Sequence, residues 1–228
     1  MAPTGFAVEQ GGILSNRFDP GLDYGNVAFT RRNRFLTTFL YELPFGRQGL
    51  FLKGASGLID RIVGGWELAG VALFQSGPFL TATTPTADPS GTNFVNLCGC
   101  AGRPDAVAGV SGNLPSGQRS VNAWFSYNAF SVPADNIGRY GTASVGSLVG
   151  PGTQAISLSL IKTVQFTESI RLQFGAEISN AFNHPNYDIP NTNFTAQQAG
   201  TGFGQIGNLQ SAEGSGPRAI QLTARISF

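Results

Sequence analysis

The stretch Ala219-Ile-Gln-Leu-Thr-Ala-Arg-Ile-Ser-Phe228 decides the fold class of this chain. Its alternate residues are apolar, and the residues between them are polar; the apolar ones are Ile220, Leu222, Ala224, Ile226 and Phe228. Successive side chains of a strand point to opposite faces, so one face is apolar and the other polar. Chain ends usually fray, so a strand this regular needs a structure to hold it. Two structures fit: a membrane β-barrel, with apolar side chains toward lipid, and an amphipathic edge strand of a soluble β-sandwich.

The composition favours the barrel. Charged residues make up 12% of the 228 residues, about half the usual globular share, whereas Gly (31) and Phe (18) are abundant. No apolar run approaches the ~20 residues that a transmembrane helix needs. The net charge of +1 gives no electrostatic argument for binding nucleic acid. The first residues lack a basic and an apolar region, so no signal peptide is recognised, and an exported protein would need one supplied upstream.

Four more segments repeat the alternating pattern. We therefore predict an all-β, antiparallel transmembrane barrel segment with about five long strands, near 34–45, 65–82, 155–166, 169–183 and 219–228. Within these segments the alternating stretches are 34–43, 66–75, 155–166, 171–182 and 219–228, and each has roughly the 9–11 residues that cross a bilayer at a tilt. Lys162 interrupts the apolar face of the third strand, which predicts either that its side chain snorkels or that a β-bulge shifts the parity there.

The connections between these strands alternate in length. A tight hairpin follows Phe166, and a moderate link that includes a predicted short helix at 50–63 joins the first two strands. Two long loops, 83–154 and 184–218, are rich in Gly, Pro, Ser, Thr and Asn, and a strand-like piece at 122–127 suggests a hairpin within the first. Outer-membrane barrels combine short periplasmic turns with long extracellular loops.

Assigning the short links to the periplasm orients all five strands consistently. An aromatic girdle is expected at that interface, and five side chains fall near it: Tyr41, Phe45, Trp66, Phe166 and Phe228. Five strands cannot close a barrel, because the smallest single-chain membrane barrels have about eight. We expect the segment, 1–228, to be open and incomplete alone, the C-terminal part of a larger barrel.

Several motifs, in chain order, resemble the barrel of TonB-dependent outer-membrane receptors, in particular the Oar-like type. They are Tyr41-Glu-Leu-Pro-Phe-Gly46, Gly64-Gly-Trp-Glu-Leu68, Gln75-Ser-Gly-Pro-Phe79, Trp124-Phe-Ser-Tyr-Asn-Ala-Phe130, Gly150-Pro-Gly152, Leu158-Ser-Leu-Ile-Lys162, Glu177-Ile-Ser-Asn-Ala-Phe-Asn-His-Pro-Asn186 and the terminal Phe228. The resemblance implies a plugged barrel of about 22 strands in the cell outer membrane. It also implies energised uptake of an unknown bulky extracellular ligand, driven by the TonB complex through a plug domain.

This sequence departs from the family pattern, since it shows no plug, no TonB-contacting segment and no carboxypeptidase-regulatory-like domain. We therefore expect it to form membrane wall and ligand-contacting loops without transporting alone. The resemblance gives the final strand a second role. A last strand with alternating apolar residues that ends in Phe, here Ile220, Leu222, Ala224, Ile226 and Phe228, resembles the signal read by the barrel-assembly machinery.

Charged side chains share the predicted lumen-facing parity of the strands. They are Glu42, Glu67, Arg171, Glu177 and Arg225. Two interpretations remain open: they contact a plug or a polar solute, or they pair across strands and hydrate the lumen wall.

The sequence offers little for catalysis, cofactors or metals, and we expect none of the three. The stretch Gly202-Phe-Gly-Gln-Ile-Gly207 matches G-x-G-x-x-G, but residues 208–217 do not favour the helix that a dinucleotide site needs after this motif. His184 is the only histidine and lies in a turn-forming Asn-His-Pro-Asn context. Cys98 and Cys100 are too close for ordinary disulfide geometry, although a strained loop disulfide stays open.

Two other hypotheses compete with the receptor segment. The first is a soluble β-sandwich that binds glycans or protein through its long loops. The second is a small barrel whose wall is completed by several copies. The receptor hypothesis names as partners outer-membrane lipid, the barrel-assembly machinery and an unknown extracellular ligand, and excludes nucleic acid.

Overall fold

The computed structural model describes residues 19–28, 30–46, 49–52, 54, 57–84, 86–93, 102–167, 170–194 and 202–228. Its contacts divide the chain into two compact units. Unit 1 comprises Met1–Asn33, Ser76–Gly152 and Tyr187–Asn208, and unit 2 comprises Arg34–Gln75, Thr153–Asn186 and Leu209–Phe228. Unit 2 holds the long strands, and unit 1 is built mainly from the connections between them.

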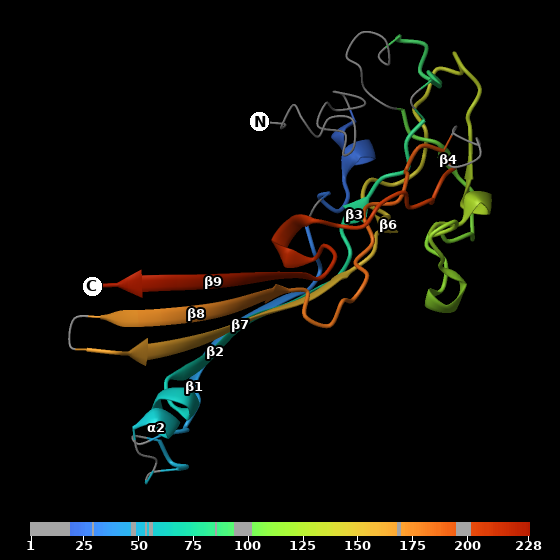
Figure 1. Ribbon diagram of the computed structural model, residues 1–228. Coiled ribbons are helices and arrows are strands. Elements are labelled where there is room, and N and C mark those ends of the chain that lie inside the picture. The colour runs from blue at the N-terminus through green and yellow to red at the C-terminus, as the bar shows by residue number, and fades with distance from the viewer. Residues whose placement is uncertain are drawn as a thin grey trace. The chain divides into compact units, whose positions relative to one another are not determined.

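Unit 2 is one antiparallel sheet of five strands (Figure 1). The strands are β1 (Arg34–Glu42), β2 (Trp66–Gln75), β7 (Thr153–Gln165), β8 (Arg171–Ser179) and β9 (Ala219–Ser227). Their order in the sheet, β1-β2-β7-β8-β9, equals their order in the chain. The two shorter links, 43–65 and 166–170, therefore lie at one end of the sheet, which we call the turn end, and the two long connections begin at the other.

The strand register separates an apolar face from a polar face. Phe35 lies opposite Phe74, and Phe174 lies opposite Ala224, on the apolar face. Many side chains of this face are exposed: Phe35 is 61% exposed and Leu222 is 78% exposed. The soluble sandwich hypothesis, which requires these residues to form a closed core, is therefore wrong.

The predicted strands are found, but several ends differ. β1 stops at Glu42 because Pro44 cannot donate to a ladder. β2 stops at Gln75, and Phe79–Leu80 is a separate short strand, β3, in unit 1, since Ser76-Gly-Pro78 interrupts the ladder. β8 ends at Ser179 because Asn180 adopts a left-handed backbone with φ of 46°. β7 begins at Thr153, two residues before the prediction.

Lys162 stays on the apolar face without a bulge. The register of β7 continues unbroken, with Lys162 opposite Trp66 on one side and Phe174 on the other. Its ammonium group donates a hydrogen bond to the carbonyl of Gly64 and lies 5.5 Å from the centre of the Trp66 ring. Of the two predicted solutions, the bulge is wrong, and the side chain reaches a polar partner at the turn end.

Unit 1 has its own hydrophobic core, although we predicted its main segment, 83–154, as a long loop. The core consists of Leu80, Ala82, Phe125, Ala129, Phe130, Ala143, Leu148, Phe194 and Phe203. Two short antiparallel pairs stabilise it: β3 with β6 (Leu148–Val149), and β4 (Asp105–Ala106) with β5 (Phe130–Ser131). The hairpin suggested at 122–127 is replaced by isolated bridges and the 3-10 turn Tyr127–Ala129, because Phe125 packs into the core.

The link between β1 and β2 contains one short α-helix, α2 (Leu58–Val63), which is the C-terminal part of the helix predicted at 50–63. In the described residues, 3-10 turns also lie at Pro20–Asp23, Ser116–Gln118 and Ala212–Gly214. No helix in the described ranges is both long and apolar enough to cross a membrane.

Candidate functional site

The five predicted lumen-facing residues lie on one face of the sheet. Glu42 is directly opposite Glu67, and Glu177 is opposite both Ser159 and Gln221. Arg171 is opposite Gln165 and Ser227, and Arg225 is opposite Gln173. The residues around them are mostly Ser, Thr and Gln, so this is the polar face of the sheet. The alternation of polar and apolar residues is incomplete, because this face also carries Leu36, Leu40, Val71, Leu73 and Ile161.

The polar face does not bring the five charges into one cluster. The Glu42–Glu67 pair lies on β1 and β2, whereas Arg171 and Arg225 lie on β8 and β9, with β7 between them. Among the described residues, ion pairs involve Arg34, Arg103 and Arg139, and none joins any of the five. Both interpretations therefore stay predictions: that these residues contact a plug or a polar solute, and that they pair across strands or hydrate the lumen wall.

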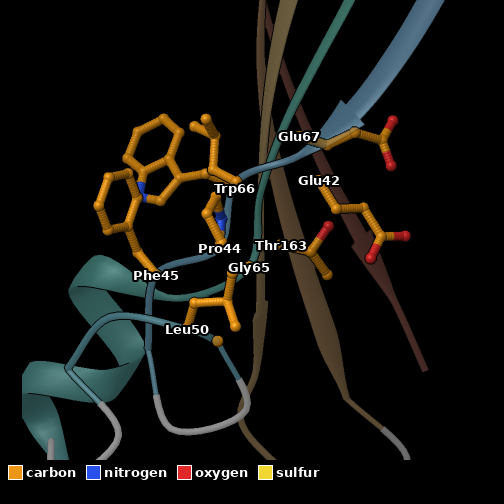
Figure 2. Close-up of a pocket in the computed structure, with 10 residues that line it drawn as sticks. Glu42, Pro44, Phe45, Leu50, Gly65, Trp66, Glu67 and Thr163 are labelled. Atoms are coloured by element: carbon orange, nitrogen blue, oxygen red, sulfur yellow. The ribbon is translucent and has the colours of Figure 1, made fainter.

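A pocket of about 550 Å³ lies beside Glu42 and Glu67 at the turn end. In Figure 2, the two carboxylates point to one side of the strands, whereas Trp66 and Phe45 point to the other. The lining also includes Pro44, Leu50, Gly65 and Thr163. Two like charges opposite each other destabilise a strand pair, so this corner suits a cationic or hydrogen-bond-donating neighbour.

The opposite end of the polar face carries a hydrogen-bonded row that the sequence did not reveal. The Arg34 guanidinium donates to Gln75 (3.1 Å) and to Glu213 (2.7 Å). Gln75 donates to the Thr153 hydroxyl (3.1 Å), and that hydroxyl donates to Gln210 (2.8 Å). Arg34, Gln75 and Thr153 each start or end a strand, and Gln210 and Glu213 precede β9, so the row ties β1, β2 and β7 to the segment before β9. The alternation of the strands places Arg34 and Gln75 on this face. No sequence motif near them indicates their hydrogen-bond partners, which lie far away in the chain.

Two buried asparagines, which the predictions also missed, hold the segment after β8. The Asn186 amide accepts a hydrogen bond from the backbone N–H of Gln154 (2.7 Å) and donates to three carbonyls, one of them that of Ser215 (3.0 Å). Asn180 donates to the carbonyls of His184 (2.9 Å) and Gly216 (2.7 Å). His184 is thus held through its backbone in a turn, as its Asn-His-Pro-Asn context predicted.

The described residues of unit 1 form two Arg–Asp ion pairs. Arg103 and Asp23 lie 3.0 Å apart with both side chains almost fully buried. Burial lowers the pKa of Arg103, and the charge of Asp23 partly offsets this effect. Arg139 donates two hydrogen bonds of 2.6 Å to Asp105, whose pKa lies below its ordinary value mainly because of these bonds. Bidentate geometry of this kind ties the loop between β5 and β6 to β4.

The remaining candidate motifs have structural explanations or lie outside the described residues. Within 202–207, Phe203 is buried in the unit 1 core, and the next elements along the chain are a short 3-10 turn and β9, not the helix of a dinucleotide site. Cys98 and Cys100 lie outside the described residues. Among the described ones, no three His, Cys, Asp or Glu side chains are grouped to hold a metal ion.

Four of the predicted assembly-signal residues, Ile220, Leu222, Ala224 and Ile226, share the apolar face of β9. Phe228 directly follows the strand and is 95% exposed. The predicted girdle residues also gather at the turn end: Trp66 begins β2, Phe166 follows β7, and Tyr41 is the next-to-last residue of β1. Aromatic side chains at that level suit a membrane–water interface.

Comparison with known proteins identifies the family. No curated protein and no solved structure shows significant similarity to this chain. One family model, described as "Outer membrane beta barrel domain", matches residues 2–221. This match agrees with the antiparallel sheet and its exposed apolar face, and it assigns the chain to the outer membrane. The chain belongs to the outer membrane beta barrel domain family.

Proposed function

We propose that the chain is part of the barrel wall of a TonB-dependent receptor of the Oar-like type, which takes up a bulky ligand with energy supplied through TonB. The observation that carries the proposal is the five-stranded meander, whose long connections leave from one end and fold into unit 1. Short turns at one end and large structured connections at the other are typical of large outer-membrane barrels. The motifs that resemble the Oar-like type span the same strands and connections.

The sheet supplies a wall segment and not a closed barrel. Among the described strands, β1 and β9 each pair with one neighbour only, so both edges offer backbone groups to further strands. A receptor barrel of about 22 strands would supply them. This is why we propose that the chain does not transport by itself, and we propose no enzymatic role for it.

In this proposal the polar face lines the lumen. Glu42 and Glu67 would present two carboxylates on β1 and β2 to a plug or a polar solute, and Arg171 and Arg225 would present two cations on β8 and β9. Unit 1 would provide the extracellular surface that first contacts the ligand. The terminal strand would be recognised by the barrel-assembly machinery.

The test is to determine the complete reading frame that contains this sequence and to assay its product for binding to the purified periplasmic domain of TonB. We expect an upstream plug domain and TonB binding that is lost when the plug is deleted. A complete frame that encodes a closed barrel without a plug, or a product that does not bind TonB, would contradict the proposal.

A copy-completed barrel is the other candidate, and the two open edges are the observation that favours it. Crosslinking between β1 and β9 of different copies in native membranes would support it. A product that contains many further strands in one chain would exclude it.

A further inference from the structure

The link between β1 and β2 exposes an unusual number of large apolar side chains outside the strands. They are Leu50 (73% exposed), Phe51 (58%), Leu52 (56%), Leu58 (75%), Ile59 (56%) and Ile62 (67%). Leu58, Ile59 and Ile62 form one stripe on α2, because residues three and four apart lie on the same side of a helix. Exposed apolar side chains grouped in this way mark a contact surface.

Contacts place α2 on the apolar side of the sheet. Trp66 and Lys162 lie opposite each other on the apolar face. The Trp66 indole donates to the carbonyl of Ile62 (3.0 Å), and the Lys162 ammonium donates to the carbonyl of Gly64, where the helix ends. The side chains that reach the helix therefore come from the lipid-facing surface, and Figure 2 shows the helix on the Trp66 side, away from Glu42 and Glu67.

The charges of the link suit a phospholipid surface. Residues 43–65 carry three basic side chains, Arg47, Lys53 and Arg61, and one acidic side chain, Asp60, which gives a net charge of +2. The Arg61 guanidinium lies 6.0 Å from the centre of the Phe166 ring at the turn end. An exposed apolar stripe in a segment of net positive charge is typical of helices that lie in the headgroup layer of a membrane.

We propose that α2 of the β1–β2 link, Leu58–Val63, is an interfacial anchor that lies in the phospholipid headgroup layer of the leaflet at the turn end, with Leu58, Ile59 and Ile62 inserted toward the acyl chains. The occupant of this surface is lipid and not protein, because the stripe continues the lipid-facing surface of the sheet at the level of Trp66 and Phe166. The proposal rests on the family's outer-membrane placement and is independent of the receptor assignment.

The test uses the full chain with Cys98→Ser and Cys100→Ser and a single spin label at Ile59→Cys or, in a second variant, Leu58→Cys. The chain is inserted into vesicles of phosphatidylethanolamine and phosphatidylglycerol and, separately, studied in isolated outer membranes. Electron paramagnetic resonance then compares the accessibility of the label to oxygen, which concentrates in lipid, and to a water-soluble nickel complex. We expect both labels to be shifted toward oxygen accessibility.

Two positions in the same background calibrate the measurement. Leu222→Cys on the apolar face of β9 reports lipid exposure, and Gly117→Cys, where an added side chain meets no neighbour, reports water exposure. Labels at 58 and 59 that resemble position 222 support the anchor. Labels that resemble position 117 overturn it, and so do labels shielded from both reagents, because shielding means that protein covers the helix.

Discussion

At the residue scale, the buried amide of Asn186 is the most connected side chain described in the sheet unit. Its hydrogen bonds reach Gln154 at the start of β7, His184 in the turn after β8, and Ser215 near β9. The amide therefore joins elements that are far apart in the sequence. A buried backbone group that loses its partner costs roughly 1–3 kcal/mol.

We therefore expect Asn186→Ala to lower the unfolding free energy of the refolded chain by roughly 1–3 kcal/mol. The measurement is urea unfolding in detergent micelles or vesicles. Asn208→Ala is the control, because that side chain is exposed, and it should change the midpoint little. Equal midpoints for the two variants would show that the amide network does not stabilise the sheet.

The Asp105–Arg139 pair makes a pH prediction. The two hydrogen bonds from Arg139 lower the pKa of Asp105 in the folded state. A group with a lowered folded pKa contributes stability above its unfolded pKa, and that contribution is lost as pH falls through the folded pKa. The relevant window lies below about pH 4, the ordinary range of an aspartate.

We expect acidification through that window to loosen the loop around Asp105. The backbone N–H of Thr142 donates to the Asp105 carboxylate (3.1 Å), so hydrogen exchange of peptides that cover Thr142, corrected for intrinsic rates, should report the change. In Asp105→Asn, protection should already be reduced at neutral pH and should vary less with pH. A wild-type response identical to that of the variant would refute this assignment.

At the scale of elements, β9 allows a direct test of which face meets lipid. Leu222 and Gln221 are neighbours on opposite faces, and Gln221 lies opposite Glu177. An arginine on the lipid face costs about 2–4 kcal/mol near the bilayer midplane. Leu222→Arg should therefore destabilise the inserted chain by about that amount, whereas Gln221→Arg should be nearly neutral. Unfolding from vesicles measures both, and similar costs for the two variants would mean that the faces are wrongly assigned.

The same strand carries the predicted assembly signal. Ile226→Ser combined with Phe228→Ser should reduce the amount of chain in the outer membrane of living cells. The loss should be larger than the loss of folding in detergent micelles, because only cells use the assembly machinery. Quantitative immunoblotting of membrane fractions checks this outcome. Gln221→Ser and Thr223→Ser, on the polar face, form the matched control. Equal losses in cells and in detergent would show that the substitutions impair folding alone.

The five strands were predictable because a period of two in side-chain polarity is a local property of each segment. Their ends were less predictable, since they depend on partners elsewhere. β2 stops at Gln75, where Pro78 and the close approach of the Gly77 and Gly150 backbones redirect the chain into unit 1. β7 begins early because Thr153 pairs with Gln75 at the end of β2.

At the scale of the whole molecule, the open sheet predicts uneven protection. β2, β7 and β8 have two neighbours each, whereas β1 and β9 have one within the described residues. Hydrogen exchange in vesicles should therefore be slower for β7 and β8 than for β1 and β9. Protection of β1 and β9 equal to that of β7 would contradict the open edges and would indicate that another chain pairs with them.

The candidate site was predicted in part. The shared face of Glu42, Glu67, Arg171, Glu177 and Arg225 follows from parity alone. β7 separates the two glutamates on β1 and β2 from the two arginines on β8 and β9. This separation depends on the order of strands in the sheet, which the sequence of one strand does not predict. The core of unit 1 escaped prediction for the same reason: Phe125 lies in an aromatic stretch, whereas Phe194 and Phe203 are isolated aromatics far along the chain, and they come together only in the fold.

That core has a consequence for recognition from outside the cell. The ring centres of Phe130, Phe194 and Phe203 lie 5.4 to 5.8 Å from one another, although the residues come from two distant stretches of the chain. If unit 1 is the external surface, an antibody or a bacteriophage that binds it reads a conformational epitope assembled from separate loops. Such an epitope disappears on denaturation, and a change in one stretch alters the surface formed by the other.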